Sequence, residues 1–89
     1  MSGHFVYLAL TSDGLYYCGY AREPASRVAV HNAGRGAKIL RGKRPVRLAY
    51  SRRFRTKSDA LRYESALKAR NHGYKRMLSL RWLAKRGDR

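Results

Sequence analysis

Apolar and aromatic residues dominate two short runs near the start of the chain, residues 4–10 and 15–20. Both runs are rich in the β-branched and aromatic side chains that are typical of strands. The segment Ser12-Asp13-Gly14 separates them and predicts a three-residue loop in which Gly14 adopts the left-handed backbone conformation. The pattern therefore predicts an antiparallel hairpin.

The length of this loop also predicts the register of the two strands. It places Ala9 opposite Tyr17 and Tyr7 opposite Gly19. Because side chains alternate with a period of two, Tyr7, Tyr17 and Gly19 are expected on one face of the hairpin, and glycine leaves open space above it. Two phenols would then share one shallow site. A slip of one residue would separate them.

A helix is predicted next, over Pro24–Asn32, because proline is tolerated in a first helical turn. Arg27 and His31 are four residues apart and would lie together along one edge, where they could face the two tyrosines. Either residue taken alone could equally be an ordinary solvated side chain. The expected buried stripe consists of Ala25, Val28 and Ala29.

The middle of the chain changes character. Residues 34–44 contain three glycines and five basic residues without apolar periodicity, which predicts a loop that either wraps a phosphate chain or is simply solvated. Pro45 introduces a short third strand over residues 46–50, expected to pair with the hairpin. In that strand Val46, Leu48 and Tyr50 should share one face.

The following helix, expected over Asp59–Arg70 with Thr56 or Ser58 as its cap, places a carboxylate on its apolar side. Glu64 falls roughly 40° from Ala60 on a helix that turns ~100° per residue. Burying an unpaired charge costs several kcal/mol, so Glu64 requires a bound cation, a buried ion pair with an arginine, or a cleft. The other members of the inward stripe are Leu61, Tyr63 and Leu67.

The C-terminal part predicts a final helix. Gly73 is expected to end the preceding helix in a left-handed cap. A helix over Tyr74–Lys85 should follow, with Trp82 packed on the sheet rather than stacked on nucleic-acid bases.

The expected fold is an α/β domain spanning residues 1–89, with a small three-stranded antiparallel sheet flanked by about three helices. No apolar run is long enough for a membrane span, which favours a cytoplasmic protein.

Charge then indicates the type of partner. The chain has 21 Lys and Arg against 5 Asp and Glu, a formal net charge of +16, and the basic residues are interspersed with apolar positions. A folded surface of this charge is typical of nucleic-acid binding, whereas a membrane surface is disfavoured by the lack of a broad apolar face.

Cys18, the single cysteine, cannot form an internal disulfide and is expected to pack as a small hydrophobe on the strand face opposite Tyr17.

Several of these features occur together, in order, in a known family. Phe5-Val6-Tyr7 followed by Tyr17-Cys18-Gly19, then Arg27, His31 and a helical Glu64, resembles the GIY-YIG nuclease superfamily. The resemblance covers roughly residues 5–68 and is closest to small stand-alone members, whose middle is similar to residues 34–38 and 41–46. This chain departs from those members at Ile39 and Leu40.

The resemblance implies a metal-dependent endonuclease that hydrolyses DNA phosphodiesters. Tyr7 would orient or deprotonate water with His31 as its proton acceptor, and Tyr17 would hold the site. Arg27 would clamp the phosphate, and Glu64 would bind a single Mg²⁺ or Mn²⁺ ion. The candidate contacts to nucleic acid are Lys38, Arg41, Lys43, Arg44 and Lys68.

The sequence is also compatible with two other interpretations. The chain could be a non-catalytic, basic nucleic-acid-binding module that keeps the fold, for RNA or ribosomes. It could also be a catalytic subunit that acts only with a protein partner supplying substrate specificity. A non-catalytic module would not explain an inward Glu64 or two tyrosines on one face.

Overall fold

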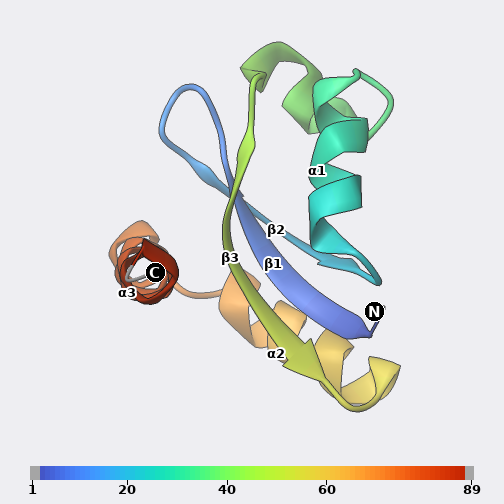
Figure 1. The fold of residues 1–89 in the computed structure, drawn as a ribbon, viewed down its shortest axis with the longest axis vertical. Helices are drawn as coiled ribbons and strands as arrows, with labels where there is room; N and C mark the ends of the chain where they lie inside the picture. The colour runs from blue at the N-terminus through green and yellow to red at the C-terminus, as the bar shows by residue number, and fades with distance from the viewer. Residues whose placement is uncertain (1–2, 88–89) are drawn as a thin grey trace.

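Three antiparallel strands form the centre of the molecule in the computed structural model, which describes residues 3–87 (Figure 1). The strands lie in the order β2-β1-β3, so the first strand is central. The predicted α/β class, with a three-stranded sheet and three α-helices, is confirmed. The elements are β1 (His4–Leu10), β2 (Tyr16–Ala21), α1 (Pro24–Asn32), the 3₁₀-helix η1 (Lys38–Lys43), β3 (Arg47–Phe54), α2 (Lys57–Lys68) and α3 (His72–Gly87).

The hairpin of β1 and β2 has the predicted loop and register. Gly14 has a φ of +86°, and the amide of Thr11 donates a hydrogen bond of 2.8 Å to the carbonyl of Leu15, which closes the loop. Tyr7 pairs with Gly19. Because this pairing follows from the local loop geometry, the sequence was sufficient to predict which side chains share a face.

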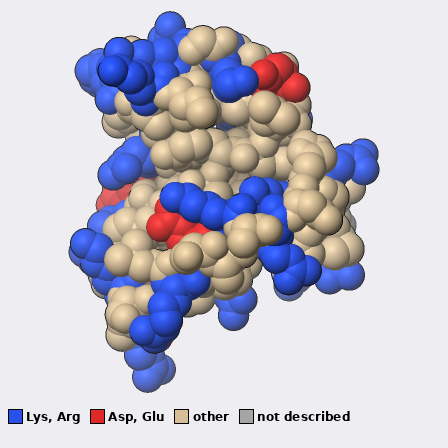
Figure 2. Space-filling model, turned by 180° about the vertical axis from the view of Figure 1, so that it is seen from behind, with Lys and Arg blue, Asp and Glu red and all other residues tan. Residues whose placement is uncertain are grey.

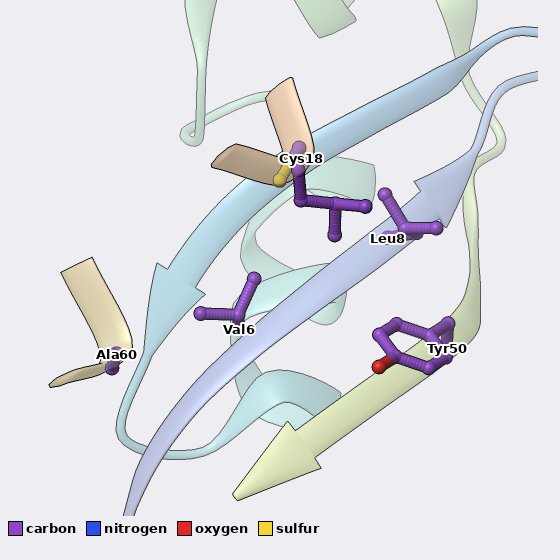
Figure 3. Close-up of a cluster of buried hydrophobic side chains, with 6 residues drawn as sticks. Val6, Leu8, Cys18, Tyr50 and Ala60 are labelled. Carbon is purple, nitrogen blue, oxygen red and sulfur yellow. The ribbon is translucent and has the colours of Figure 1, made fainter. Parts of the chain in front are cut away.

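The sheet is covered on both faces. Helix α1 and η1 pack on one face, over Tyr7 and Ala9, whereas α2 and α3 pack on the other, over Val6 and Leu8 (Figure 1). The face under α2 and α3 holds one hydrophobic cluster, and Figure 3 shows its strand residues gathered on one side of the sheet. Its buried members are Val6, Leu8, Cys18, Tyr50, Ala60 and Leu67.

The third strand differs from the prediction in length and in regularity. It runs to Phe54, and a bulge interrupts its pairing with β1 between Leu8 and Ala9. A bulge adds a residue to one strand and breaks the alternation of its side chains. Consequently Leu48 packs on the α1 side and Tyr50 on the α2 side, and the expectation that they share a face was wrong.

The helix boundaries also required correction. Helix α2 was predicted over Asp59–Arg70 but spans Lys57–Lys68, two residues earlier. Thr56 caps it by accepting a hydrogen bond from the amide of Asp59. Gly73 does not cap it with a left-handed conformation. Instead Gly73 lies in the first turn of α3, where Asn71 accepts a hydrogen bond of 2.9 Å from the amide of Tyr74. Residues 34–44 are not all loop, because η1 buries Leu40.

Two predicted apolar stripes proved partly wrong. In α1 the buried residues are Pro24, Val28 and His31, while the two alanines expected there are exposed. In α2 Leu61 is 42% exposed, although Ala60 and Leu67 are buried as expected. His31, which was expected along one edge of the helix together with Arg27, is instead buried, and its burial shapes the candidate site.

Candidate active site

Tyr7 lies at the centre of the site, on the middle strand. Its side chain is only 1% exposed, and Gly19 lies opposite it on β2. A Cβ atom at position 19 would lie 2.7 Å from the Tyr7 hydroxyl and 2.8 Å from Cζ, closer than side chains approach one another. Glycine at this position is therefore required for the tyrosine ring to pack this closely against β2.

His31 contacts the Tyr7 hydroxyl directly. Its Nε2 atom lies 2.9 Å from Tyr7 Oη, and its Nδ1 atom accepts a hydrogen bond of 3.1 Å from the backbone amide of Ala37. An amide can only donate, so Nδ1 carries no proton, and a neutral imidazole must then carry its proton on Nε2. His31 thus donates to Tyr7, and the phenol oxygen accepts.

Gly36 completes the support of His31 and was not singled out by the sequence as a site residue. A Cβ atom at position 36 would lie 1.9 Å from Nδ1 of His31 and 2.8 Å from its Cα, so no side chain fits there. The turn of backbone around Gly36 brings the amide of Ala37 to the ring. The glycine-rich composition of residues 34–44 was the available signal.

Tyr17 closes the cluster from β2. Its ring lies 6.3 Å from that of Tyr7 and 5.5 Å from that of His31, in an edge-to-face arrangement with the imidazole. The shared face predicted for the two tyrosines is confirmed. Edge-to-face contacts of this kind hold rings in fixed relative orientations.

Burial determines the protonation states of this pair. It raises the pKa of Tyr7 well above its usual value, the neighbouring Tyr17 adds to the rise, and the guanidinium of Arg27 opposes it. Burial also lowers the pKa of His31, and Arg27 lowers it further. At neutral pH the pair is therefore a neutral phenol and a neutral imidazole.

Arg27 lies one helical turn before His31 on α1. Its side chain is exposed, and it makes no ion pair or hydrogen bond with any residue within 3–87. Its charge acts on both Tyr7 and His31, as their pKa values indicate. An uncompensated guanidinium beside a neutral polar pair is suited to an oxyanion.

Glu64 approaches from the other layer of the molecule. Helix α2 packs against the edge strand β2, where the thiol of Cys18 lies 3.9 Å from the carbonyl of Glu64. The Glu64 side chain is 15% exposed, and its carboxylate lies 3.3 Å from the ammonium of Lys68, itself 60% exposed. The carboxylate adds to the rise in the pKa of Tyr7, so the two groups interact electrostatically, although they share no hydrogen bond.

The donor set limits what metal this carboxylate could bind. Within residues 3–87 no three His, Cys, Asp or Glu side chains are grouped closely enough to hold a metal ion. A single, largely buried carboxylate fits a hard divalent ion such as Mg²⁺, which retains several waters and takes further oxygens from substrate phosphates. Glu64 fits such a site, and the ammonium of Lys68 provides positive charge beside the carboxylate.

Of the basic residues predicted to contact nucleic acid, Lys68 pairs with Glu64 on α2, and the four within residues 38–44 fall into two groups. Lys43 pairs with Asp13 at 2.7 Å, and Arg44 donates to the carbonyls of Arg41 and Asn32, so both hold the loop. Lys38 is exposed, as is the side chain of Arg41. The face seen in Figure 2 carries many Lys and Arg side chains and few acidic ones.

A family model described as the GIY-YIG catalytic domain matches residues 3–76. The chain belongs to the GIY-YIG family. The match includes Tyr7, Tyr17, Arg27, His31 and Glu64, and it ends within α3.

The relatives of this GIY-YIG protein include small proteins of similar length. A UPF0213 protein of Staphylococcus aureus strain N315 is 43% identical over 86 residues, covering 97% of this chain and all of the relative. The solution structure of a UPF0213 protein of Bacillus halodurans is 35% identical, with a TM-score of 0.56 over 89% of this chain and 85% of that one. A solution structure from E. faecalis is 39% identical, with a TM-score of 0.57 over 84% and 83%.

The family membership supports a nuclease-type protein that binds nucleic acid. No helix within residues 3–87 combines the length and apolar character needed to cross a membrane.

Proposed function

We propose that this protein is a metal-dependent endonuclease that hydrolyses DNA phosphodiesters. The observation that carries the proposal is the hydrogen bond between His31 and Tyr7, buried beside the uncompensated guanidinium of Arg27. A buried polar pair of this kind contributes little to stability, since both groups are desolvated. It is well explained as a preorganised reaction site.

Arg27 binds the scissile phosphate. Its planar guanidinium can donate two parallel hydrogen bonds to phosphate oxygens and offset the charge that gathers on them as the bond breaks. Its exposure leaves it open to a substrate that is too large to enter a closed pocket.

Tyr7 positions the attacking water. Because its oxygen accepts from His31, the hydroxyl proton is free to point toward a water or phosphate oxygen. The hydrogen bond from Ala37 favours a donor role for His31, in place of the proton-accepting role that the family resemblance first suggested. If Tyr7 loses its proton, the N–H of His31 and the charge of Arg27 both stabilise the phenolate.

Glu64 would hold the divalent ion, Mg²⁺ or Mn²⁺. When bound, the ion supplies positive charge to the phosphate and to the departing oxygen. The single carboxylate and the competing ammonium of Lys68 support weak binding in the free protein, which improves when DNA contributes a phosphate oxygen.

Cleavage of labelled linear, branched and single-stranded DNA, with Mg²⁺, Mn²⁺ or EDTA, tests this proposal. Tyr7→Phe and Glu64→Ala should each lower the rate by about 10²-fold or more while binding is retained. Tyr63→Phe is the matched control, because Tyr63 also shares a hydrogen bond, of 2.8 Å, with a tyrosine but lies on the α2 side. If Tyr63→Phe lost cleavage, or if Tyr7→Phe cleaved at the wild-type rate, the assigned roles would be contradicted.

The net charge of +16 favours a second candidate, a non-catalytic nucleic-acid-binding module. Binding should in either case fall steeply between about 50 and 200 mM salt, because each phosphate contact releases counterions. Tight, salt-sensitive binding without cleavage of any substrate under any metal condition would favour this second candidate. Cleavage that appears only when a cell extract is added would instead indicate a partner protein.

A further inference from the structure

A second basic cavity lies at the end of the sheet where β1 begins. It has a volume of about 450 Å³ and is lined by Gly3, His4, Arg22, Arg53, Phe54 and Arg55. Figure 1 shows this end of β1 beside the connection from β2 to α1, and the amide of Gly3 donates a hydrogen bond of 3.3 Å to the carbonyl of Arg22. We refer to it as the Arg22–Arg53–Arg55 cleft.

The charges of this cleft are not compensated within the protein. The structure describes four acidic residues, and three of them pair elsewhere: Asp13 with Lys43, Asp59 with Arg62, and Glu64 with Lys68. None of the three arginines forms an ion pair within residues 3–87. Three guanidiniums gathered without a counter-charge repel one another, and an anion would relieve that repulsion.

The cleft is also partly preorganised. The Nε atom of Arg22 donates to the carbonyl of Gly3, which holds the base of its guanidinium. Arg53 packs on the same glycine, since a Cβ atom at position 3 would lie 2.7 Å from its Nε. His4 shares a hydrogen bond of 2.8 Å with Tyr20 through Nδ1. Side chains held in this way lose less entropy when they bind a ligand.

The cleft continues toward the candidate active site. A neighbouring hollow of about 240 Å³ has Arg22 in common with it and also contains Arg27. Along β1, His4 in the cleft and Tyr7 are three residue steps apart, about 10 Å in a strand. That is roughly the axial rise of three nucleotide steps along one DNA strand. The acidic group in the hollow is Glu23, which accepts a hydrogen bond from Ser26.

We propose that the Arg22–Arg53–Arg55 cleft binds a phosphate of the same nucleic-acid strand whose scissile phosphate lies at Arg27. This inference rests on the proposed function for the position of the scissile phosphate. The guanidinium forks suit phosphate oxygens, and Arg22 links the two sites. The cleft would thereby fix the direction of the strand and the distance from the anchored phosphate to the cut.

Binding of short fluorescent oligonucleotides, single-stranded and duplex, in EDTA tests the cleft without any cleavage. The double variant Arg53→Gln and Arg55→Gln should lower affinity about tenfold or more and reduce the salt slope by about one to two. The matched control is Arg76→Gln with Arg81→Gln, which removes the same charge from exposed positions of α3 and should change affinity less than threefold. Equal losses in the two double variants would overturn the proposal.

A 5′-phosphate and a 5′-hydroxyl on the same oligonucleotide distinguish the possible sources of the phosphate. Equal affinity indicates an internal phosphodiester, whereas a gain from the 5′-phosphate that disappears in the cleft variant indicates a strand terminus. Unchanged affinity of the cleft variant for both oligonucleotides would again overturn the proposal. The Arg53→Lys and Arg55→Lys variant keeps the charge and should bind with intermediate affinity, which guards against a folding defect of the glutamine variant.

This experiment separates the cleft from the proposed function. If the wild-type protein bound through the cleft but never cleaved, phosphate binding by the cleft would stand and the proposed nuclease activity would fall. If the wild-type protein cleaved DNA while the cleft and control variants bound with equal affinity, the nuclease activity would stand and phosphate binding by the cleft would fall.

Discussion

The two faces of the sheet are built from alternate residues of the same strands, yet they have different chemistry. Under α2 and α3, Val6 and Leu8 pack in an apolar cluster (Figure 3). Under α1, Tyr7 occupies the equivalent depth with its hydroxyl bonded to His31. Within residues 3–87 every buried polar side-chain atom has a partner, including the Tyr50 hydroxyl on the α2 side, which shares a hydrogen bond with Tyr63, so both faces bear the cost of desolvation without orphaned groups.

The contrast teaches which layer stabilises the fold and which serves the reaction. Burial of apolar area stabilises a small domain, whereas a buried, satisfied polar pair is close to neutral. In 89 residues the protein can devote most of each face to one purpose because β1 is central and buried on both sides, while α2 adds Glu64 to the candidate site. Substitutions on the two faces should therefore separate stability from activity.

The largest expected effect on stability comes from the apolar face. Leu8→Ala removes a fully buried side chain and should lower the free energy of unfolding by about 2–5 kcal/mol. The folded fraction should cleave DNA at the normal rate per molecule. Urea unfolding, combined with activity normalised to the folded fraction, measures both. A specific activity that falls in proportion to stability would contradict the division between the faces.

The next largest effect is expected on the α1 face, where one substitution should lower both stability and cleavage activity. Gly36→Ala would force a methyl group into the His31 ring, breaking the hydrogen bond from Ala37, at a cost of about 1–3 kcal/mol and most of the activity. Gly42→Ala is the control, since a Cβ atom there meets nothing within 4 Å. Thermal melts and cleavage rates of the two variants provide the comparison, and equal behaviour would refute the close fit at Gly36.

The two faces were not equally predictable from the sequence. The hairpin loop around Gly14 sets its register locally, so the shared face of Tyr7 and Tyr17 could be predicted. The bulge opposite Leu8 and Ala9 could not, because nothing in residues 46–50 marks an interrupted alternation. The burial of His31 depends on Gly36 and Ala37, which approach only in the folded chain. Local rules thus predicted one strand pair, and tertiary contacts completed the site.

A smaller effect should appear in the pH dependence of stability. The pKa of His31 is lower in the folded protein than its usual value near 6.5, so the folded state binds fewer protons than the unfolded state. Its stabilising contribution is complete above about pH 6.5 and is lost as the pH falls toward the folded-state pKa. Unfolding measured between pH 7.5 and 5 should show this loss. It should be absent in His31→Gln and retained in His72→Gln, whose residue is exposed.

The smallest expected change in stability is at Glu64, the charged residue that α2 brings to the apolar side. Glu64→Ala should alter the free energy of unfolding by no more than about 0.5 kcal/mol, because its partner Lys68 is 60% exposed and i,i+4 pairs of this kind contribute little. Removing a largely buried carboxylate also removes its desolvation cost. A buried arginine partner would have made the loss about 3–5 kcal/mol.

Lys68→Ala sharpens this prediction about Glu64. If the carboxylate is retained for an ion, removing the neighbouring ammonium should leave stability unchanged and tighten Mn²⁺ binding several-fold, because the competing positive charge is gone. Titration of Mn²⁺ by its paramagnetic signal measures this in wild type, Lys68→Ala and Glu64→Ala, the last of which should bind least. If Glu64→Ala unfolded more easily by several kcal/mol and Mn²⁺ binding were equal in all three, Glu64 would be a structural residue of α2, and the apolar face would have no part in the chemistry.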